Sequence, residues 1–487
     1  MSGKATTEKS KTEKAESLPD GWKRVRLGEV VDGIRNGFVY KYNEIENEGI
    51  PVTRIETISN GKIDISKVAY LKKKNKKIEK FILIPGDILF SHINSIEHVG
   101  KCAIYNGKPS VLIHGMNLLL LRTKKEFYSN LFLYMFLNME NVRNKIRNLA
   151  GKAVNQVSIK VSELEKFLLS LPPLPEQRKI AEILETVDNV IEKTDAIIEK
   201  YRRIKKGLIA DLLRGKIRLI PYGHSEAEGE ESHLLTSPEA KKFVIGNKTF
   251  VAVPNQRWKD SPIGKIPEDW EVAKMNSIIK EGLISGIWGE EPKDYENVYP
   301  ILRSTEITHS GKIETETVEF RKVMLERSKI SKYVLRNGDI LIVSSSGSEE
   351  LIGRVAIFKD SGNETFLFSN FLLRLRFGET TSHMYIFYFL SSFWYQSFLA
   401  KFQETSTGLR NFPKNEFLAL LFPLPPLPEQ QLIADVLSQV DEVIEKEIQY
   451  KEKLERIKKG LMEDLLTGKV RVNNLIKEDI QNDTKVL

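Results

Sequence analysis

The heptapeptide Leu-Pro-Pro-Leu-Pro-Glu-Gln occurs twice in the 487-residue chain, at 171–177 and, unchanged, at 424–430. The match continues beyond the heptapeptide, because about 30 of the 48 positions from 171 to 218 are identical to those from 424 to 471. Two matching segments of this length cannot arise by coincidence, and internal self-similarity of this kind indicates a repeated architecture. The chain is therefore interpreted as two copies of one unit, each ending in a nearly invariant segment.

Each nearly invariant segment has the pattern of a long α-helix. Pro175 and Pro428 are tolerated in a first turn, where their missing N–H has no intrahelical partner, and Gly215 and Gly468 end the segments as C-terminal caps. Apolar residues recur at steps of three and four, which is typical of a coiled-coil stripe. Roughly 38 helical residues would span about 57 Å, and a helix this long with one apolar stripe needs a partner, which the other copy supplies. The residues predicted to pack helix against helix are Ile180, Leu184, Val187, Ile191, Ile198, Tyr201, Ile433, Leu437, Val440, Ile444, Ile448 and Leu461.

The segment before each helix repeats more loosely. Gly86-Asp87-Ile88-Leu89 returns as Gly338-Asp339-Ile340-Leu341, and the Trp22 entry motif returns at Trp270. Short apolar runs around the Gly-Asp pairs predict strands, and longer apolar runs predict helices packed against them. The sequence thus predicts an α+β fold, in which two mixed α/β domains alternate with two long coiled-coil-like helices.

The expected domain boundaries follow from the repeat and from composition. They are a disordered N-terminal arm at 1–17, a first α/β domain at 18–170, a first helix at 171–218, a linker with an acidic segment at 219–261, a second α/β domain at 262–423, a second helix at 424–471 and a C-terminal tail at 472–487. The linker is predicted because residues 223–239 are polar and acidic. The uncharged stretch at 384–400 is short for a membrane span of about 20 residues and is interpreted as a buried helix.

The sequence contains no defensible catalytic signature. It has no phosphate-binding glycine loop and no dinucleotide-binding glycine motif, and its seven histidines are scattered. Asp87 and Asp339 recur in both copies, but a Gly-Asp pair between apolar runs is normally a turn whose carboxylate accepts backbone hydrogen bonds. The single cysteine, Cys102, allows no intrachain disulfide, which favours a reducing cytoplasm. These features indicate a binding protein and not an enzyme.

A net charge of +8 permits a polyanionic partner without demonstrating one. The lysine run at 72–77 could contact phosphates or form a solvated face, and the cations at 200–218 could complement the helix dipole or contact DNA or a partner subunit. Arg, Asn and Gln side chains can pair with base edges, although a role in loop structure explains each candidate equally well. The candidate DNA-binding residues are Arg35, Asn36, Lys41, Lys72, Lys73, Lys74, Ser91, His92, Asn94, Lys101, Lys152, Asn155, Gln156, Ser285, Trp288, Ser344, Ser345, Ser346, Arg354, Thr407, Arg410, Asn411 and Lys414.

This arrangement resembles the DNA-specificity subunit of type I restriction-modification systems. The resemblance covers residues 18–471 and lies in two variable domains alternating with two near-identical helices, which open on Leu-Pro-Pro-Leu-Pro-Glu-Gln and close on Gly-Lys-Ile/Val-Arg. It implies two target-recognition domains, each recognising one half of a split, asymmetric site in double-stranded DNA. It also implies that the helices pack antiparallel, related by a pseudo-two-fold axis, and act as a ruler between the half-sites.

The resemblance further implies partners. Two methyltransferase subunits and two motor-nuclease subunits would complete the complex, and they would hold S-adenosylmethionine, ATP and magnesium. No cofactor, metal or membrane is expected for this chain. A standalone DNA methyltransferase or nuclease would need methylation and cofactor motifs that the sequence lacks, and a coiled-coil adaptor without a DNA role would leave the two divergent α/β domains unexplained.

Overall fold

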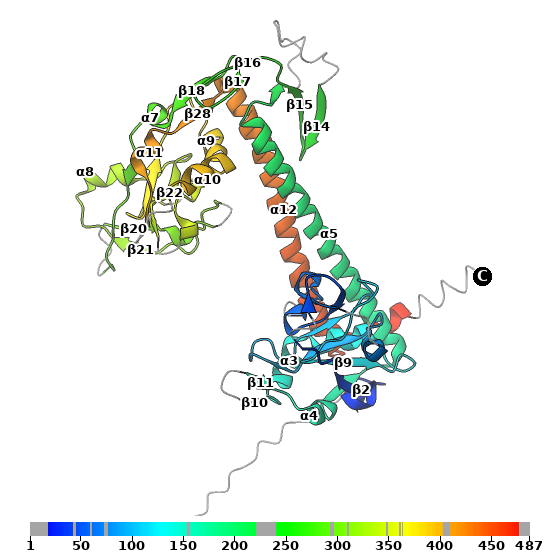
Figure 1. Ribbon diagram of the computed structural model, residues 1–487. Coiled ribbons are helices and arrows are strands. Elements are labelled where there is room, and N and C mark those ends of the chain that lie inside the picture. The colour runs from blue at the N-terminus through cyan, green and yellow to red at the C-terminus, as the bar shows by residue number, and fades with distance from the viewer. Residues whose placement is uncertain are drawn as a thin grey trace, which may run out of the picture. The chain divides into compact units, whose positions relative to one another are not determined.

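The computed structural model folds into two compact units. Unit 1 is formed by residues 1–194 and 450–487, and unit 2 by residues 195–449, so each unit holds one α/β domain and a stretch of both long helices (Figure 1). The structure describes residues 18–41, 45–58, 61–72, 76–152, 156–220, 240–292, 297–308, 311–346, 349–359, 362, 364–402 and 410–476. The expected arm at 1–17 and the acidic segment at 223–239 lie outside the described residues.

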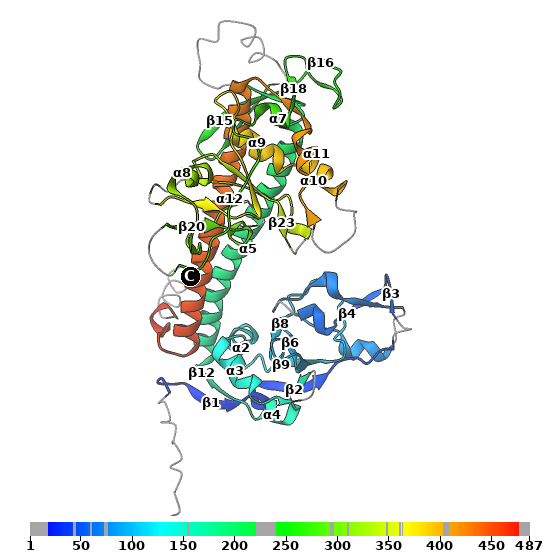
Figure 2. The ribbon, with the colours of Figure 1, turned by 90° about the vertical axis from the view of Figure 1, so that its left-hand side faces the viewer.

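The domain of unit 1 is built on a four-stranded antiparallel sheet. Its strand order is β2-β9-β6-β8, formed by β2 (Val31–Asn36), β9 (Leu118–Thr123), β6 (Ile88–Ser91) and β8 (Cys102–Ile104). Side chains alternate across a strand. Ile88 and Phe90 therefore pack with the helices α2 (Asn130–Leu137) and α3 (Glu140–Arg147) on one face (Figure 2), while Leu89 packs with Leu83 and Tyr105 on the other.

The remaining elements of unit 1 are short. They are β1 (Lys23–Arg26), α1 (Leu27–Val30), β3 (Ile45–Glu46), β4 (Ile50–Val52), β5 (Ala69–Leu71), β7 (Ile93–Asn94), β10 (Gly151–Lys152), β11 (Val157–Ser158), α4 (Val161–Glu165) and β12 (Leu168–Leu171). Strand β1 pairs with β12 at the entrance to the first long helix, and β3, β5 and β4 form a separate three-stranded sheet.

Unit 2 repeats this plan. Its central sheet has the order β19-β26-β22-β24, formed by β19 (Ile284–Ser285), β26 (Leu372–Leu375), β22 (Ile340–Val343) and β24 (Val355–Ile357). Its other elements are α7 (Met275–Ile278), β18 (Glu271–Lys274), β20 (Val298–Leu302), β21 (Phe320–Lys322), α8 (Arg327–Ile330), β23 (Ser345–Ser346), β25 (Leu367–Phe368), β27 (Arg410–Asn411), α11 (Lys414–Leu418) and β28 (Leu421–Leu424). Because strand β18 pairs with β28 as β1 pairs with β12, the prediction of a duplicated α/β scaffold is confirmed.

The apolar stretch at 384–400 forms two helices and not the single buried helix that the sequence predicts. They are α9 (His383–Leu390) and α10 (Phe393–Ala400). The break falls at Ser392, whose hydroxyl accepts a hydrogen bond from the backbone N–H of Tyr395 and so caps the second helix. No helix in the described ranges is long and apolar enough to cross a membrane.

The long helices are α5 (Leu174–Leu212) and α12 (Leu427–Leu466), with 39 and 40 residues. Within unit 1, Lys458 Nζ lies 2.6 Å from Asp188 Oδ1, and residues just beyond the end of α12 contact the start of α5. Within unit 2, Lys205 Nζ lies 2.6 Å from Asp441 Oδ1. In both units the residue number rises along one helix as it falls along the other, so the predicted antiparallel pairing is confirmed.

The apolar stripes of the two helices pack into the domain cores as well as against each other. Ile180 and Leu184 share a buried cluster with Leu465 and Leu466 of the other helix and with Phe132 of the domain of unit 1. In unit 2 the buried cluster of the second domain includes Ile433, Leu437 and Val440 of α12, and Tyr201 of α5 packs against it. Ile198 is buried, whereas Val187, Ile191, Ile444, Ile448 and Leu461 are half-buried.

The heptapeptide glutamine ties each domain to its helix. Gln177 Oε1 accepts a hydrogen bond of 2.9 Å from the backbone N–H of Ser129, the cap of α2, while its Nε2 donates to the carbonyl of Pro172 at 2.8 Å. Gln430 makes the same two bonds, at the same lengths, to Ser382 and Pro425. The glutamine therefore recurs because in each copy it joins the start of the long helix to the domain by hydrogen bonds.

The heptapeptide glutamate binds an arginine from the other copy. In unit 2, Glu429 accepts hydrogen bonds from Nε and Nη2 of Arg218 at 2.5 and 2.7 Å, and from the indole of Trp270 at 2.8 Å. In unit 1, Glu176 accepts two bonds from Arg471 at 2.7 and 2.9 Å. Burial lowers the pKa of Arg218, but its hydrogen bonds with Glu429 and Asp269 outweigh burial and leave that pKa above its ordinary value.

The glycine that follows each helix packs against the proline and tryptophan of the entry motif of the other copy. Gly215 has φ +64°, and a Cβ there would lie 2.3 Å from Pro267 Cγ. Gly468 has φ +76°, and a Cβ there would lie 2.6 Å from Pro19 Cγ. Both positions need glycine for its left-handed backbone and for the close approach. The end of each copy therefore packs against the entry of the other copy.

The segment predicted as a linker, 219–261, is folded into strands in its described part. Strand β13 (Ile217–Ile220) pairs with β15 (Lys248–Pro254), which pairs with β14 (Lys241–Ile245), and β16 (Trp258–Lys259) pairs with β17 (Ile266–Pro267). The turn between β14 and β15 is Gly246-Asn247, a two-residue hairpin loop. Phe250 and Ile245 are buried in the core of unit 2, so this segment belongs to the folded unit.

The Gly-Asp turns combine the predicted turn geometry with an ion pair from a buried aspartate to an arginine. Asp87 and Asp339 accept backbone hydrogen bonds from Ile84 at 2.9 Å and Arg336 at 2.7 Å, which confirms the turn interpretation. Their carboxylates also accept two bonds each from one arginine, at 2.7 and 2.6 Å in both units. This arginine is Arg122 in unit 1 and Arg376 in unit 2.

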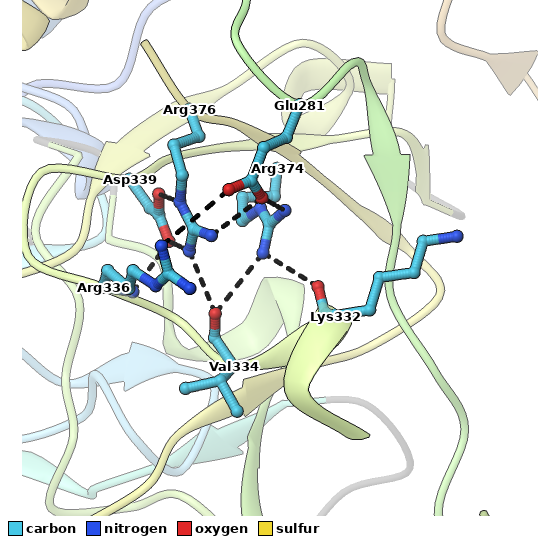
Figure 3. Close-up of polar contacts among 7 residues, drawn as sticks. All are labelled: Glu281, Lys332, Val334, Arg336, Asp339, Arg374 and Arg376. Atoms are coloured by element: carbon cyan, nitrogen blue, oxygen red, sulfur yellow. Dashed lines mark hydrogen bonds and ion pairs between the residues drawn. The ribbon is translucent and has the colours of Figure 1, made fainter. Parts of the chain in front are cut away.

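Unit 2 extends this ion pair into a network. Figure 3 shows Arg374 and Arg376 converging on Glu281, with Nη–Oε2 distances of 2.7 and 2.8 Å. Arg374 is fully buried and also donates to the carbonyls of Lys332 and Val334 at 2.9 and 3.3 Å. A buried guanidinium needs such partners. The network therefore serves to hold the sheet and the neighbouring loop together.

Glu429→Gln tests the pairing between copies. Losing one partner of a buried ion pair costs about 3–5 kcal/mol. Because Asp269 still binds Arg218, we expect the free energy of unfolding to fall by an amount at the lower end, about 3 kcal/mol. Urea denaturation followed by tryptophan fluorescence measures this change. The control is Asp435→Asn, which breaks an exposed pair with Lys248 and should cost less than about 1 kcal/mol. Equal midpoints for the two variants would contradict the role of Glu429.

Candidate nucleic-acid interface

The domain of unit 2 carries a polar cleft of about 630 Å³. It lies where β22 runs into β23, beside β27 and the start of α11. Its lining residues are Ser344, Ser345, Asn370, Phe371, Asn411, Phe412, Pro413, Lys414, Asn415 and Glu416. Four of the candidates predicted from distant parts of the sequence, Ser344, Ser345, Asn411 and Lys414, therefore line one cleft.

Backbone hydrogen bonds fix the walls of this cleft. The N–H and the hydroxyl of Ser344 both donate to the carbonyl of Phe371, at 2.8 and 2.9 Å, and the N–H of Phe412 donates to the carbonyl of Ser344 at 2.9 Å. The N–H of Leu372 donates to the carbonyl of Ser369 at 2.9 Å, which closes a tight turn. That turn presents Asn370 and Phe371 at the mouth of the cleft, and both are exposed.

The cleft is rich in carboxamide groups. Asn370, Asn411 and Asn415 are exposed, and their side chains make no hydrogen bond to another residue in the described part of the chain. A carboxamide offers two donors and an acceptor, so three of them beside Ser345 can pair with the polar edges of a ligand. Lys414 and Glu416 add one charge of each sign.

An aromatic pair, Trp288 and Phe371, lies beside the cleft. Trp288 is 66% exposed and its ring meets Phe371 edge-on, with centroids 6.2 Å apart at 83°. The Ser285 hydroxyl donates to the carbonyl of Asn370 at 3.1 Å. Gly286 lies between them in sequence, and a Cβ there would be 2.1 Å from the carbonyl oxygen of Phe368. The close approach of these two segments therefore places Ser285 and Trp288 next to the cleft.

Unit 1 has the corresponding strands with different side chains. Strand β7 pairs with β11 and β11 with β10, as β23 pairs with β27. Asn94 is half-buried, and its Nδ2 donates to the Ser91 hydroxyl at 3.2 Å. Ser91 and His92 are buried at 1% and 7% exposure, and burial lowers the pKa of His92. Asn94 is therefore the accessible polar side chain among these three candidates.

The other candidates of unit 1 are spread over its domain. Asn36 Oδ1 accepts hydrogen bonds from the N–H groups of Gly37 at 2.9 Å and Asn117 at 3.1 Å, so it also shapes the turn. Lys72 pairs with Glu46 at 3.4 Å. Lys101 Nζ lies 2.8 Å from His98 Nδ1, and burial together with Arg143 and Arg147 lowers its pKa. Arg35, Lys41 and Gln156 are exposed.

The remaining candidates are not among the lining residues of the cleft, or they lie outside the described residues. Arg354 is half-buried and donates to the carbonyl of Ile307 at 3.4 Å. Ser346 lies in β23 next to Ser345. Lys73, Lys74, Asn155 and Thr407 lie outside the described residues, and only the backbone is described for Lys152 in β10 and Arg410 in β27.

Six lining residues of the cleft were not among the candidates: Asn370, Phe371, Phe412, Pro413, Asn415 and Glu416. Asn370 and Phe371 lie in an apolar run that continues into β26, and Phe371 matches the pattern of a core strand residue. Asn415 lies beside Lys414, so the cluster of polar residues after Arg410 was the available signal. Among the described residues, no group of three His, Cys, Asp or Glu side chains could hold a metal ion.

Comparisons with known proteins agree with this architecture. The model of the type I restriction modification DNA specificity domain matches residues 19–200 and 267–456, once in each copy. The putative type I restriction enzyme MjaX specificity subunit of Methanocaldococcus jannaschii is 35% identical over 470 residues, which cover 95% of this chain and 96% of that protein. The EcoKI specificity subunit of Escherichia coli is 24% identical over 436 residues, covering 88% and 83%.

A solved structure shows the same fold. The type I restriction-modification S subunit from M. genitalium superposes with a TM-score of 0.54 at 13% identity, covering 93% of this chain and 98% of that chain. The family match extends over most of the sequence and repeats with the two copies. The chain belongs to the family of DNA-specificity subunits of type I restriction-modification systems.

Proposed function

We propose that each α/β domain recognises one half of a bipartite, asymmetric site in double-stranded DNA. The observation that carries this proposal is one scaffold with different side chains at the same strand register. Ser345 faces Asn411 across β23 and β27 in unit 2, whereas Ile93 faces Ser158 across β7 and β11 in unit 1. Because each base pair shows its own donor and acceptor pattern in the major groove, different side chains on one scaffold select different sequences.

The chain supplies recognition and no chemistry in this proposal. It acts in the cytoplasm, within a complex whose methyltransferase and motor-nuclease subunits hold S-adenosylmethionine, ATP and magnesium. The family of the relatives supports this division of labour. The family model and the relatives give no support to a standalone methyltransferase or nuclease, or to a coiled-coil adaptor.

The long helices set the distance between the half-sites and bind partner subunits. A docking surface is supported by apolar side chains that point away from the paired helices. On α5, Ile197 and Ile204 are 38% and 36% exposed, with exposed Lys200 between them. On α12, Tyr450 and Ile457 are 47% and 43% exposed, with exposed Lys453 between them. Residues seven apart share one helix face, so both helices repeat one apolar and basic patch.

Exchange of residues 18–170 for the same domain of a relative tests the modular recognition. We expect one half of the methylated motif to change and the other half to stay, because each domain reads its own half. Single-molecule sequencing of adenine methylation in cells that carry the complex gives both halves at once. A motif changed in both halves, or in neither, contradicts the proposal.

Lengthening both helices together tests the ruler. Seven residues inserted after Thr194 in α5 and seven after Gln449 in α12 keep the apolar stripe in phase and add about 10 Å to the pair. Since adjacent base pairs are about 3.4 Å apart, we expect the unspecified spacer to grow by about three base pairs with both half-sites unchanged. An active variant that keeps the original spacer shows that the helices do not set the distance.

Charge substitution on the exposed patches tests docking. Ile197→Glu with Ile204→Glu places two carboxylates where an apolar contact is expected, so the variant should bind methyltransferase subunit at least tenfold more weakly, a change of about 1.4 kcal/mol. Analytical ultracentrifugation measures the association. Lys206→Glu, an exposed change on the same helix, is the matched control. Equal binding by the two variants means that the patch is not the docking surface.

A further inference from the structure

An exposed apolar side chain occupies the same position in both domains. Gly37 in unit 1 and Gly286 in unit 2 each approach a backbone carbonyl so closely that a Cβ would lie 2.0 Å from Gly115 O and 2.1 Å from Phe368 O. The residue after each glycine makes a parallel bridge to the opposite segment, Phe38 to Gly115 and Ile287 to Ser369. The next residues are Val39 and Trp288, which are 71% and 66% exposed.

Single exposed apolar residues are common on protein surfaces and need no special explanation. The position of Trp288 differs because two further observations accompany it. Its ring contacts Phe371, another exposed aromatic side chain, which also lines the polar cleft. The register-equivalent residue in the other domain is apolar and exposed too, although the two side chains differ greatly in size. Both domains therefore present an exposed apolar side chain to a ligand at this position of the scaffold.

The polar side chains of the cleft indicate which base pair would lie next to this apolar contact. Asparagine pairs with adenine through N6 and N7 in the major groove, and arginine pairs with guanine. Asn370, Asn411 and Asn415 line the cleft and are exposed. The partner of adenine is thymine, whose C5-methyl group is the one apolar group in the major groove. Asparagines beside an exposed aromatic pair thus match an adenine–thymine base pair.

We infer that Trp288 is a specificity-determining residue, which packs against the C5-methyl group of a thymine in the half-site that unit 2 reads. Asn370, on the same turn as Phe371, lies where it can pair with an adenine of the same or the neighbouring base pair. This inference rests on the proposed function, because it assigns the bases recognised by the cleft of unit 2. The corresponding residue of unit 1, Val39, makes a smaller apolar contact in the other half-site.

Replacing thymine by deoxyuridine tests the contact, because it removes the methyl group and leaves base pairing intact. The chain is assembled with its methyltransferase subunits and bound to a duplex that carries the methylated motif found by sequencing. Each thymine of the second half-site is then replaced in turn. We expect one replacement to weaken binding about fourfold, the value of one buried methyl-sized group. Fluorescence anisotropy measures the affinities.

The variant Trp288→Ala should bind the thymine duplex more weakly than the wild type and should not distinguish thymine from deoxyuridine at that position. Trp288→Val, which copies the residue of unit 1, should keep part of the discrimination. Phe393→Ala is the matched control, because Phe393 is an exposed aromatic side chain at 76% that lies on α10 outside the cleft. It should discriminate as the wild type does. Thermal denaturation confirms that the variants fold.

Three results would overturn the inference. The first is a second half-site in which no deoxyuridine replacement changes affinity. The second is a Trp288→Ala variant that still discriminates thymine from deoxyuridine. The third is an equal loss of affinity for both duplexes at every position, which means that Trp288 stacks on the DNA without reading a methyl group. These results differ from failure of the proposed function, in which the wild-type complex shows no preference for the methylated motif over unrelated DNA.

Discussion

The fold depends on one ion pair that is made twice. A glutamate of the repeated heptapeptide, buried at the start of each long helix, binds the arginine that follows the end of the other helix. The partners come from different copies of the repeat and lie 211 and 295 residues apart in sequence. Neither copy can complete this contact alone, so each compact unit is assembled from both copies. A buried carboxylate without its arginine would be costly, which accounts for the unchanged sequence at both sites.

This constraint separates the chain into parts that must stay alike and parts that can differ. The heptapeptide Gln and Glu and the terminal Gly and Arg have the same partners in both units. The strands of the central sheets correspond in order, but the side chains of the short paired strands beside them differ, as Ser345–Asn411 against Ile93–Ser158 shows. A protein that recognises two unlike half-sites needs this combination of a common scaffold and different side chains on it.

The sequence predicted the repeat, the long helices and the Gly-Asp turns, because each has a local pattern. It did not predict the Glu–Arg pairs, since periodicity says nothing about contacts between residues more than 200 positions apart. The hairpin around Gly246-Asn247 was not predicted, because the acidic segment before it indicates a linker. Its two-residue turn nevertheless favours a hairpin. Ser345, Asn411 and Lys414 were identified as candidates, but Phe371 looks like a core residue, and only the tight turn at Ser369 explains its exposure.

The most direct measurement of the central claim is single-molecule sequencing of adenine methylation in the host, with this gene intact and with it deleted. If the two domains give the complex its specificity, one bipartite motif with two unlike halves and an unspecified spacer disappears on deletion and returns on complementation. Methylation that is unchanged by deletion, or a lost motif that is contiguous and symmetric, would contradict the account.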